Sequence, residues 1–386
     1  MTMAMPVSDG NLRAPSAPIW IRARAHAAAQ VDRVTRRLTV DAPVLEGALR
    51  RLDDTLSLRS IRARVVEVRA ETHDVNTYVL RPNARFKSFQ PGSFVNIKLR
   101  IDGKSVQRSY SISSAPSPDG LFAITVKRVE GGLVSNWLAD NVKPGFVLPL
   151  SAPQGQFVLP SERPDALLML SAGSGITPVM SMLRQLAREE ERPITFVHFA
   201  RSPQDLIFHD ELQRIAQFAP HVKLVFCVEQ GDASWQGLVG RFTQELLGEV
   251  APNFRELDTF MCGPSGFMKA VVKTLEETGA ELSRLRYERF GADFDASAFI
   301  GHGQLVRFAK SGGESMSTTP RTILDEAERL GINVEWGCRA GNCGTCRCKK
   351  FSGVVTDITT GLESGPGEDF ILPCVSIPRG AVEVEL

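Results

Sequence analysis

The stretch C-R-A-G-N-C-G-T-C-R-C at residues 338–348 decides how the rest of this sequence is interpreted. It holds four of the seven cysteines of the 386-residue chain, with glycines between them. The N-terminus lacks an apolar signal segment, and no apolar run approaches the roughly eighteen residues needed to span a bilayer. We therefore expect a cytoplasmic protein, in which clustered cysteines bind metal more often than they form disulfides.

The spacing of the cysteines narrows the kind of metal site. Cys338, Cys343 and Cys346 form C-x4-C-x2-C, and Cys374 follows after a longer gap. This is the plant-type 2Fe–2S arrangement, whereas a zinc site would more naturally pair two C-x2-C hairpins or use histidine. No histidine follows His302, so these four cysteines are the predicted metal ligands. Three glycines let the loop wrap the cluster and aim amides at its sulfides: Gly337, Gly341 and Gly344.

The flanks of the cysteine stretch agree with a small iron–sulfur domain. Cys348 lies on an alternating stretch typical of a strand, so we interpret it as a packing residue rather than a ligand. Apolar residues at helical spacing end at Gly331, and strand-like alternation occurs near both ends of the region. Residues 304–386 resemble a plant-type ferredoxin domain, and the resemblance implies a β-grasp fold.

Residues 60–162 contain short alternating stretches separated by glycine and proline, which predicts an antiparallel β-barrel. Within it, R-S-Y-S at 108–111 and G-G-L-V-S at 131–135 resemble the flavin signatures of the ferredoxin-reductase superfamily. The resemblance implies a bound flavin. The sequence resembles the FAD-binding members of the superfamily more than the FMN-binding ones, but FMN stays open. The implied flavin-binding residues are Arg108, Ser109, Tyr110, Ser111, Lys127, Gly131, Gly132, Leu133, Val134 and Ser135.

The side chains in these signatures suit their expected roles. Arg108 offers a fork of donors for a phosphate, and Tyr110 offers a flat face to the isoalloxazine. Ser111, the first expected catalytic residue, can hydrogen-bond toward the reactive edge of the ring. The amides of Gly131–Gly132 can approach a pyrophosphate, and Ser135 is expected to cap the helix that follows.

Residues 163–291 alternate strand and helix patterns, which predicts a parallel α/β domain. S-A-G-S-G-I-T-P at 171–178 is not the G-x-G-x-x-G fingerprint, but it resembles the superfamily's own pyridine-nucleotide loop. M-C-G-P at 261–264 resembles the segment beside the nicotinamide, which implies that Cys262 is the second catalytic residue, although a cysteine at a strand end also fits plain packing. Cys227 is expected in the core. The implied nucleotide-binding residues are Gly173, Gly175, Thr177, Arg201, Ser202, Cys262, Gly263 and Pro264.

The residues after the predicted strand at 194–200 bear on the choice of nucleotide. An acidic residue there would bind the 2′-hydroxyl of NADH, whereas Arg201 with the hydroxyl of Ser202 suits the 2′-phosphate of NADPH. We therefore predict NADPH, with NADH open because Asp205 is close. E-R-F-G at 288–291 resembles the end of the reductase portion, where Phe290 is a candidate to stack on the flavin, and 292–303 is the expected linker.

In this order of parts, residues 60–386 resemble the phthalate-dioxygenase-reductase type of electron-transfer protein, including the branch that serves acyl desaturases and phenylacetyl-CoA epoxidation. The resemblance implies an enzyme that takes hydride from NAD(P)H onto flavin and passes single electrons through a 2Fe–2S cluster to an oxygenase or desaturase. The alternative is a non-catalytic carrier or binding module with a passive ferredoxin relay. The intact nucleotide and flavin motifs favour the enzyme.

Residues 1–59 fall outside the resemblance and are predicted to form a helical extension with an arginine-rich face. We interpret the extension as a cap on the barrel. The alternative is a docking surface for an acidic partner or an anionic membrane, which would make the protein peripherally membrane-associated. The net charge of +1 gives no reason to expect nucleic acid as a partner.

Overall fold

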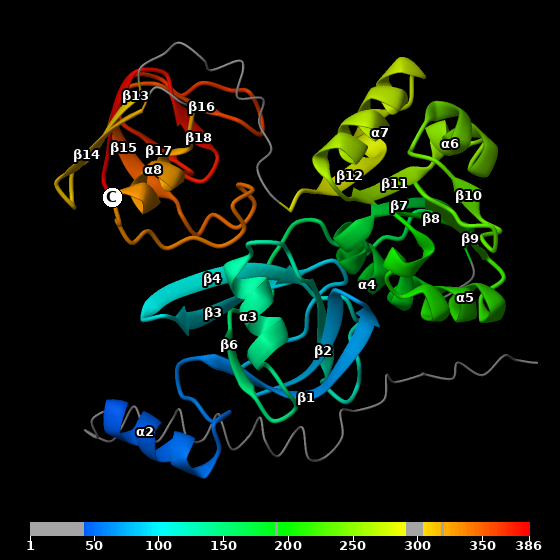
Figure 1. Ribbon diagram of the computed structural model, residues 1–386, viewed down its shortest axis with the longest axis horizontal. Coiled ribbons are helices and arrows are strands. Elements are labelled where there is room, and N and C mark those ends of the chain that lie inside the picture. The colour runs from blue at the N-terminus through cyan, green and yellow to red at the C-terminus, as the bar shows by residue number, and fades with distance from the viewer. Residues whose placement is uncertain (1–41, 190–191, 291–303, 318–319) are drawn as a thin grey trace, which may run out of the picture.

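The computed structural model describes residues 42–189, 192–290, 304–317 and 320–386. It contains three domains built on β-sheets, and Figure 1 shows the first below the other two, with the second to its upper right and the third to its upper left. Residues 1–41 of the predicted extension and the predicted linker at 292–303 lie outside the described residues. No helix in the described part of the chain is long and apolar enough to cross a membrane.

The first domain is the predicted antiparallel barrel, with strand order β4-β3-β6-β1-β2-β5. Alternation along its strands sends one set of side chains inward, where Tyr78, Ile97, Phe122 and Leu148 are almost fully buried. The helix α3 covers one end of the barrel through Leu138. The elements are β1 (Ile61–Thr72), β2 (Val75–Pro82), β3 (Phe94–Ile101), β4 (Lys104–Ser111), β5 (Phe122–Lys127), α3 (Leu133–Asn141) and β6 (Val147–Leu150).

The second domain is the predicted parallel sheet, with strand order β10-β9-β8-β7-β11-β12. Its central strand β7 (Leu167–Ala172) is buried at every residue, as a parallel strand covered on both faces must be. The other strands are β8 (Ile194–Ala200), β9 (Val222–Val228), β10 (Leu238–Val239), β11 (Asp258–Cys262) and β12 (Leu285–Glu288). The α-helices are α4 (Ile176–Leu186), α5 (His209–Phe218), α6 (Gln244–Val250) and α7 (Ser265–Glu277), joined by short 3-10 turns.

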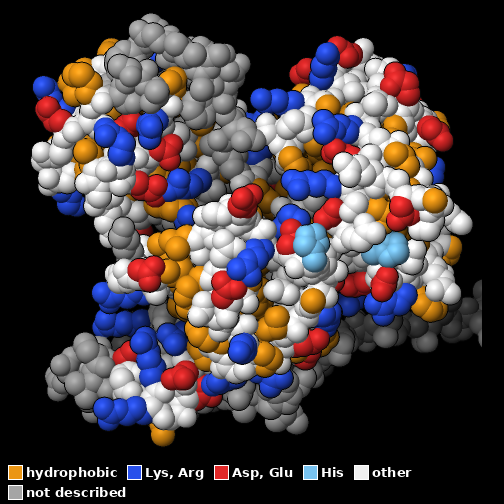
Figure 2. Space-filling model, viewed as in Figure 1, with side chains coloured by type: hydrophobic (Ala, Val, Ile, Leu, Met, Phe, Trp, Pro, Cys, Tyr) orange, Lys and Arg blue, Asp and Glu red, His pale blue; other side chains and the backbone are white. Residues whose placement is uncertain are grey.

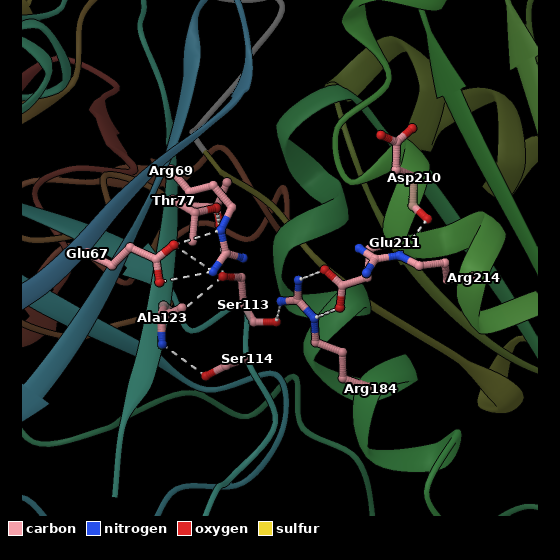
Figure 3. Close-up of polar contacts among 11 residues, drawn as sticks. Glu67, Arg69, Thr77, Ser113, Ser114, Ala123, Arg184, Asp210, Glu211 and Arg214 are labelled. Atoms are coloured by element: carbon pink, nitrogen blue, oxygen red, sulfur yellow. Dashed lines mark hydrogen bonds and ion pairs between the residues drawn. The ribbon is translucent and has the colours of Figure 1, made fainter. Parts of the chain in front are cut away.

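Helix α4 joins the second domain to the barrel (Figure 3). Ser181 donates a hydrogen bond to the carbonyl of Ser114 at 2.6 Å, and Arg184 donates to the carbonyl of Ser113. The Arg184 guanidinium also makes a two-point ion pair with Glu211 of α5, at 2.6 and 2.8 Å. This fork fixes the arginine, so two part-buried hydrogen bonds link the nucleotide domain to the barrel just after the strand that ends at Ser111.

The third domain has a five-stranded sheet in the order β14-β13-β19-β15-β17 and a two-stranded sheet of β16 and β18. Lys350 is fully buried, and its ammonium donates to the carbonyls of Gly353 and Gly365 at 2.8 and 2.9 Å and to that of Gly367. The elements are β13 (Gln304–Phe308), β14 (Gly313–Ser317), α8 (Ile323–Arg329), β15 (Cys348–Ser352), β16 (Val355–Asp357), β17 (Asp369–Ile371), β18 (Ser376–Pro378) and β19 (Ala381–Val384).

The described end of the N-terminal extension is helical, as predicted, and contacts the barrel. Helix α2 (Ala42–Leu52) is followed by a turn in which Asp53 pairs with Arg64 of β1 at 2.8 Å. Asn83 at the end of β2 donates to the carbonyl of Thr55 at 2.9 Å. These contacts fit the interpretation of the extension as a cap on the barrel.

Candidate functional site

A cavity of about 350 Å³ opens where the three domains meet. The barrel, the nucleotide domain and the iron–sulfur domain all contribute to its wall, the last through Cys338 and Asn342. Its volume is typical of a cofactor site. The structure brings these predicted flavin residues together in its lining: Arg108, Ser109, Tyr110, Ser111, Lys127, Gly132, Leu133, Val134, Ser135 and Phe290. Thr177, predicted for the nucleotide, lines it as well.

The loop before α3 is built for close approach of a ligand to the backbone. Gly131 has a φ of +69°, and a Cβ on Gly132 would lie 2.6 Å from the Ser135 hydroxyl. The prediction that Ser135 caps α3 is wrong. The helix begins at Leu133 with Gly132 as its N-cap, so Ser135 lies inside the first turn, where it accepts from the amide of Val129 at 3.3 Å. No side chain caps this helix, which leaves its amides available to a pyrophosphate.

The aromatic and cationic residues of R-S-Y-S are both half-buried in this cavity. Burial raises the pKa of the Tyr110 phenol, so the ring remains neutral and presents an uncharged face. Burial and the neighbouring Arg339 lower the pKa of Arg108 to about 10, which still leaves the guanidinium charged at neutral pH. A charged fork of donors beside a flat neutral ring fits a flavin phosphate next to its isoalloxazine.

Glu288 is a site residue that the sequence interpretation missed. It ends β12, is 7% exposed and hydrogen-bonds the side chain of Ser111. The carboxyl oxygen Oε2 is buried without a hydrogen-bond partner. Burial raises the pKa of Glu288 to about 8, against the opposing effect of the Ser111 hydrogen bond. The E-R-F-G motif contained this residue, but its pairing with the strand of Cys262 could not be inferred from spacing.

Cys262 lies opposite Glu288 in the parallel pairing of β11 and β12. It is fully buried and lines neither this cavity nor the nucleotide cavity of the next paragraph. Burial and the charge of Glu288 raise the pKa of its thiol. A Cβ on Gly175 would lie 2.3 Å from the carbonyl of Cys262, so a glycine is needed for the nucleotide loop to cross this strand end.

A second cavity, of about 650 Å³, lies at the carboxyl ends of the parallel strands and meets the first at Lys127 and Ser174. The chain leaves β7 toward β8 on one side and places β11 on the other, so this edge is a topological switch point, where open α/β sheets bind nucleotides. Of the predicted residues, Gly173, Arg201 and Pro264 line it. Ser202 does not line it, and its hydroxyl donates to Asp205, which does, at 2.7 Å. Gly263 packs beneath it against Phe267 and Ala172.

The four predicted metal ligands lie together as two hydrogen-bonded pairs. The hydrogen bond between Cys338 and Cys343 lowers the pKa of Cys343 to about 5, and the bond between Cys346 and Cys374 lowers the pKa of Cys346. No group of three or more Cys, His, Asp or Glu among the described residues is arranged to hold one metal ion. Two pairs of thiols fit a cluster of two irons, each with two cysteine ligands, better than a mononuclear zinc site.

The loop around these cysteines also places backbone donors against a cysteine sulfur. The amides of Ala340 and Cys343 donate to the sulfur of Cys338 at 3.4 and 3.3 Å. Gly341 and Gly344 have φ angles of +77° and +67°, which turn the loop around the thiols. The remaining cysteines pack as predicted: Cys348 is buried at the start of β15, and Cys227 is buried in the nucleotide sheet.

Comparisons with known proteins agree with the three domains. Residues 62–159 match the oxidoreductase FAD-binding domain family, residues 169–273 the oxidoreductase NAD-binding domain family, and residues 310–379 the 2Fe-2S iron-sulfur cluster binding domain family. The glycine betaine monooxygenase reductase subunit of Chromohalobacter salexigens is 37% identical over 348 residues, covering 83% of this chain and 94% of that protein. An NADPH oxidoreductase of Mycobacterium tuberculosis is 37% identical over 329 residues, covering 84% of each chain.

Solved structures show the same architecture. Phthalate dioxygenase reductase has a TM-score of 0.58 at 23% identity, and the match covers 84% of this chain and 97% of that one. The FAD/NAD-binding domain of the Vibrio cholerae nitric oxide dioxygenase has a TM-score of 0.55 at 29% identity, covering 60% of this chain and 99% of that one.

The fold and the site define an NAD(P)H-dependent oxidoreductase with a flavin-binding, a nucleotide-binding and a 2Fe–2S domain. The chain belongs to the ferredoxin-reductase-type electron-transfer proteins with a C-terminal 2Fe–2S domain, the family of the oxygenase reductase subunits.

The paired thiols predict the effect of cysteine variants. Serine in place of Cys338, Cys343, Cys346 or Cys374 should abolish or strongly shift the visible absorption and EPR signal of the cluster, because one of the two irons then loses a thiolate ligand. Cys348→Ser is the matched control and should leave both signals in place. A cluster that survives Cys374→Ser but not Cys348→Ser would show that the ligand set is wrong.

Proposed function

We propose that this reductase delivers single electrons from NADPH to a partner oxygenase. The observation that carries the proposal is the position of Cys338, a predicted cluster ligand that lines the same cavity as Ser111 and Glu288. A short path between the flavin site and the cluster is what an electron-transfer chain requires. A passive relay would need no such shared cavity beside an intact nucleotide site.

The chain's own residues have separate roles in this proposal. When bound, the flavin converts a two-electron hydride into single electrons, and the 2Fe–2S cluster carries them out one at a time. Arg108 and the amides before α3 hold the phosphates, and Tyr110 positions the ring. Ser111 and the neutral carboxyl of Glu288 form a hydrogen-bonded pair at the cavity wall that can hold and move a proton there.

The names of related reductases support an oxygenase as the electron acceptor. Relatives that cover most of this chain carry names such as glycine betaine monooxygenase reductase subunit and stachydrine N-demethylase reductase subunit, at 37% and 33% identity. A desaturase is the second candidate acceptor, on resemblance alone. Reconstitution with a candidate oxygenase tests the assignment, since NADPH-dependent product formation should require this chain and should stop without it.

The nucleotide cavity supports a preference for NADPH. Arg201 is exposed on its wall, and Arg241 lines the same cavity while paired with Glu229 at 2.9 Å. Two guanidinium groups beside an open cavity suit a 2′-phosphate better than a 2′-hydroxyl. The hydroxyl of Ser202 does not contribute to this preference in the structure, because Asp205 accepts its hydrogen bond.

The raised pKa of Glu288 predicts a pH dependence of flavin reduction. The carboxyl is neutral below about pH 8, so the rate of flavin reduction by NADPH should fall about tenfold per pH unit above that value if the neutral form is required. Glu288→Gln keeps an uncharged side chain beside Ser111 and should flatten the profile. The measurement is stopped-flow flavin absorbance from pH 6 to 10.

Protein stability provides a second readout for the same group. Because the folded-state pKa of Glu288 is raised above 4.5, only the folded state keeps this proton at intermediate pH. The contribution of Glu288 to the free energy of unfolding should therefore decline as pH rises from about 4.5 to about 8, and Glu288→Gln should remove that decline.

The rate profile has its own contradicting outcome. If the wild type and Glu288→Gln show the same break near pH 8 in the rate of flavin reduction, Glu288 is not the source of that break.

Arg201→Ala tests the nucleotide preference. Loss of a charge-assisted contact to the 2′-phosphate should raise the KM for NADPH about tenfold and change that for NADH little. Arg255→Ala, an exposed arginine that does not line the cavity, is the control and should change neither constant. Equal effects of Arg201→Ala on both nucleotides would contradict the assignment.

A further inference from the structure

The indole of Trp336 lies between two arginines from different domains. The guanidinium carbon of Arg108, on β4 of the barrel, is 3.7 Å from the ring centroid, and that of Arg339, in the cysteine loop, is 3.8 Å away. Two guanidinium groups this close to one centroid must occupy opposite faces of the ring. Trp336 stands two residues before the predicted ligand Cys338, so the stack joins the barrel directly to the cluster loop.

The outer member of this stack is held by carboxylates. Arg339 pairs with Asp325 at 3.2 Å and with Glu328, both on helix α8. These carboxylates offset the repulsion that two guanidinium groups would otherwise feel across one ring. The stack is therefore a continuous chain from α8 through Arg339 and Trp336 to Arg108.

Arg108 can contact the indole and a flavin phosphate at the same time. Its guanidinium carbon lies 3.7 Å from the centroid of Trp336, and a guanidinium that contacts a ring in this way can still use its N–H donors for other partners. One of these donors bonds the carbonyl of Gln107 at 2.8 Å, and the side chain lines the flavin cavity. A phosphate that accepts from the remaining donors would hold the guanidinium in the orientation that the indole needs.

Other contacts between the barrel and the cluster loop are consistent with docking at this point. Lys98 of β3 pairs with Glu335. A Cβ on Gly337 would lie 3.2 Å from the side chain of Asn96 and 3.3 Å from that of Gln107, so the backbone of the loop lies directly against the barrel. The Lys98–Glu335 pair is exposed and worth little by itself, which leaves the cation–π stack as the specific contact.

We propose that Trp336 is a positioning residue that docks the ferredoxin domain over the flavin cavity and, through Arg108, couples flavin binding to that docking. The proposal rests on the function proposed above. Coupling between two sites is reciprocal: if flavin strengthens docking, then docking strengthens flavin binding by the same factor. Loss of the indole should therefore weaken flavin binding although Trp336 itself does not line the flavin cavity.

The test compares Trp336→Leu and Trp336→Gln, which remove the π face, with Trp336→Phe, which keeps one. FAD is titrated into cluster-loaded protein stripped of flavin, and the dissociation constant is measured by flavin fluorescence. We expect a rise of about five- to twentyfold for Leu and Gln and less than about threefold for Phe. Hydrogen exchange of residues 335–343 is measured with and without FAD. Added FAD should slow exchange in the wild type and the Phe variant but not in the other two.

A third readout addresses the electron path. After mixing with NADPH, the Leu and Gln variants should reduce flavin at the wild-type rate under saturating FAD, while cluster reduction slows. The matched control is Phe370→Leu, which disrupts a second arginine–aromatic pair in the same domain, that with Arg347 at 4.7 Å. This control should match the wild type in all three measurements.

Equal flavin affinity and equal exchange in all Trp336 variants would overturn the proposal. Loss of the cluster EPR signal in both non-aromatic variants would also overturn it, because Trp336 would then be a structural residue of the loop. Failure of the reductase function has a different signature: the wild type would not oxidise NADPH, whereas FAD titration and hydrogen exchange would still report the coupling.

Discussion

The account depends on one constraint: a ligand of the iron–sulfur cluster must lie in the wall of the flavin cavity. Hydride carries two electrons, and a 2Fe–2S cluster accepts one, so the sites for the two cofactors must be adjacent. Cys338, the predicted ligand, meets this requirement from the third domain, while Ser111 comes from the barrel and Glu288 from the nucleotide sheet. Each domain alone is an ordinary fold, and the site exists only where the three meet.

The ionisable groups around this meeting point suit its chemistry. The nucleotide side has a carboxyl that burial keeps protonated up to about pH 8. The cluster side has Arg108 and Arg339, separated by the indole of Trp336 and balanced by carboxylates of α8. A neutral acid, Glu288, and a cation, Arg108, therefore line the same cavity, where a proton and an anionic phosphate respectively have to be held.

Much of the fold and of the candidate site could be predicted from the sequence, because the spacing of residues along short stretches determines them. The C-x4-C-x2-C loop, the flavin and nucleotide motifs and the order of the sheets depend on residues close together in the chain. The misses involve contacts between strands or domains. Glu288 becomes a site residue through the pairing of β12 with β11, and Trp336 through contact with the barrel. The expected cap by Ser135 failed for a local reason, since this cavity residue lies inside the helix, and the hydroxyl of Ser202 donates to Asp205.

The most direct test of the central claim compares the full chain with a form that ends at Phe290 and so lacks the third domain. Under saturating FAD, both should oxidise NADPH at similar rates with ferricyanide, which takes electrons from reduced flavin. The account predicts that the shorter form reduces cytochrome c, or the partner oxygenase, far more slowly, because the exit beside Cys338 is gone. Equal rates with the one-electron protein acceptor would contradict the account, since the cluster would then lie off the electron path.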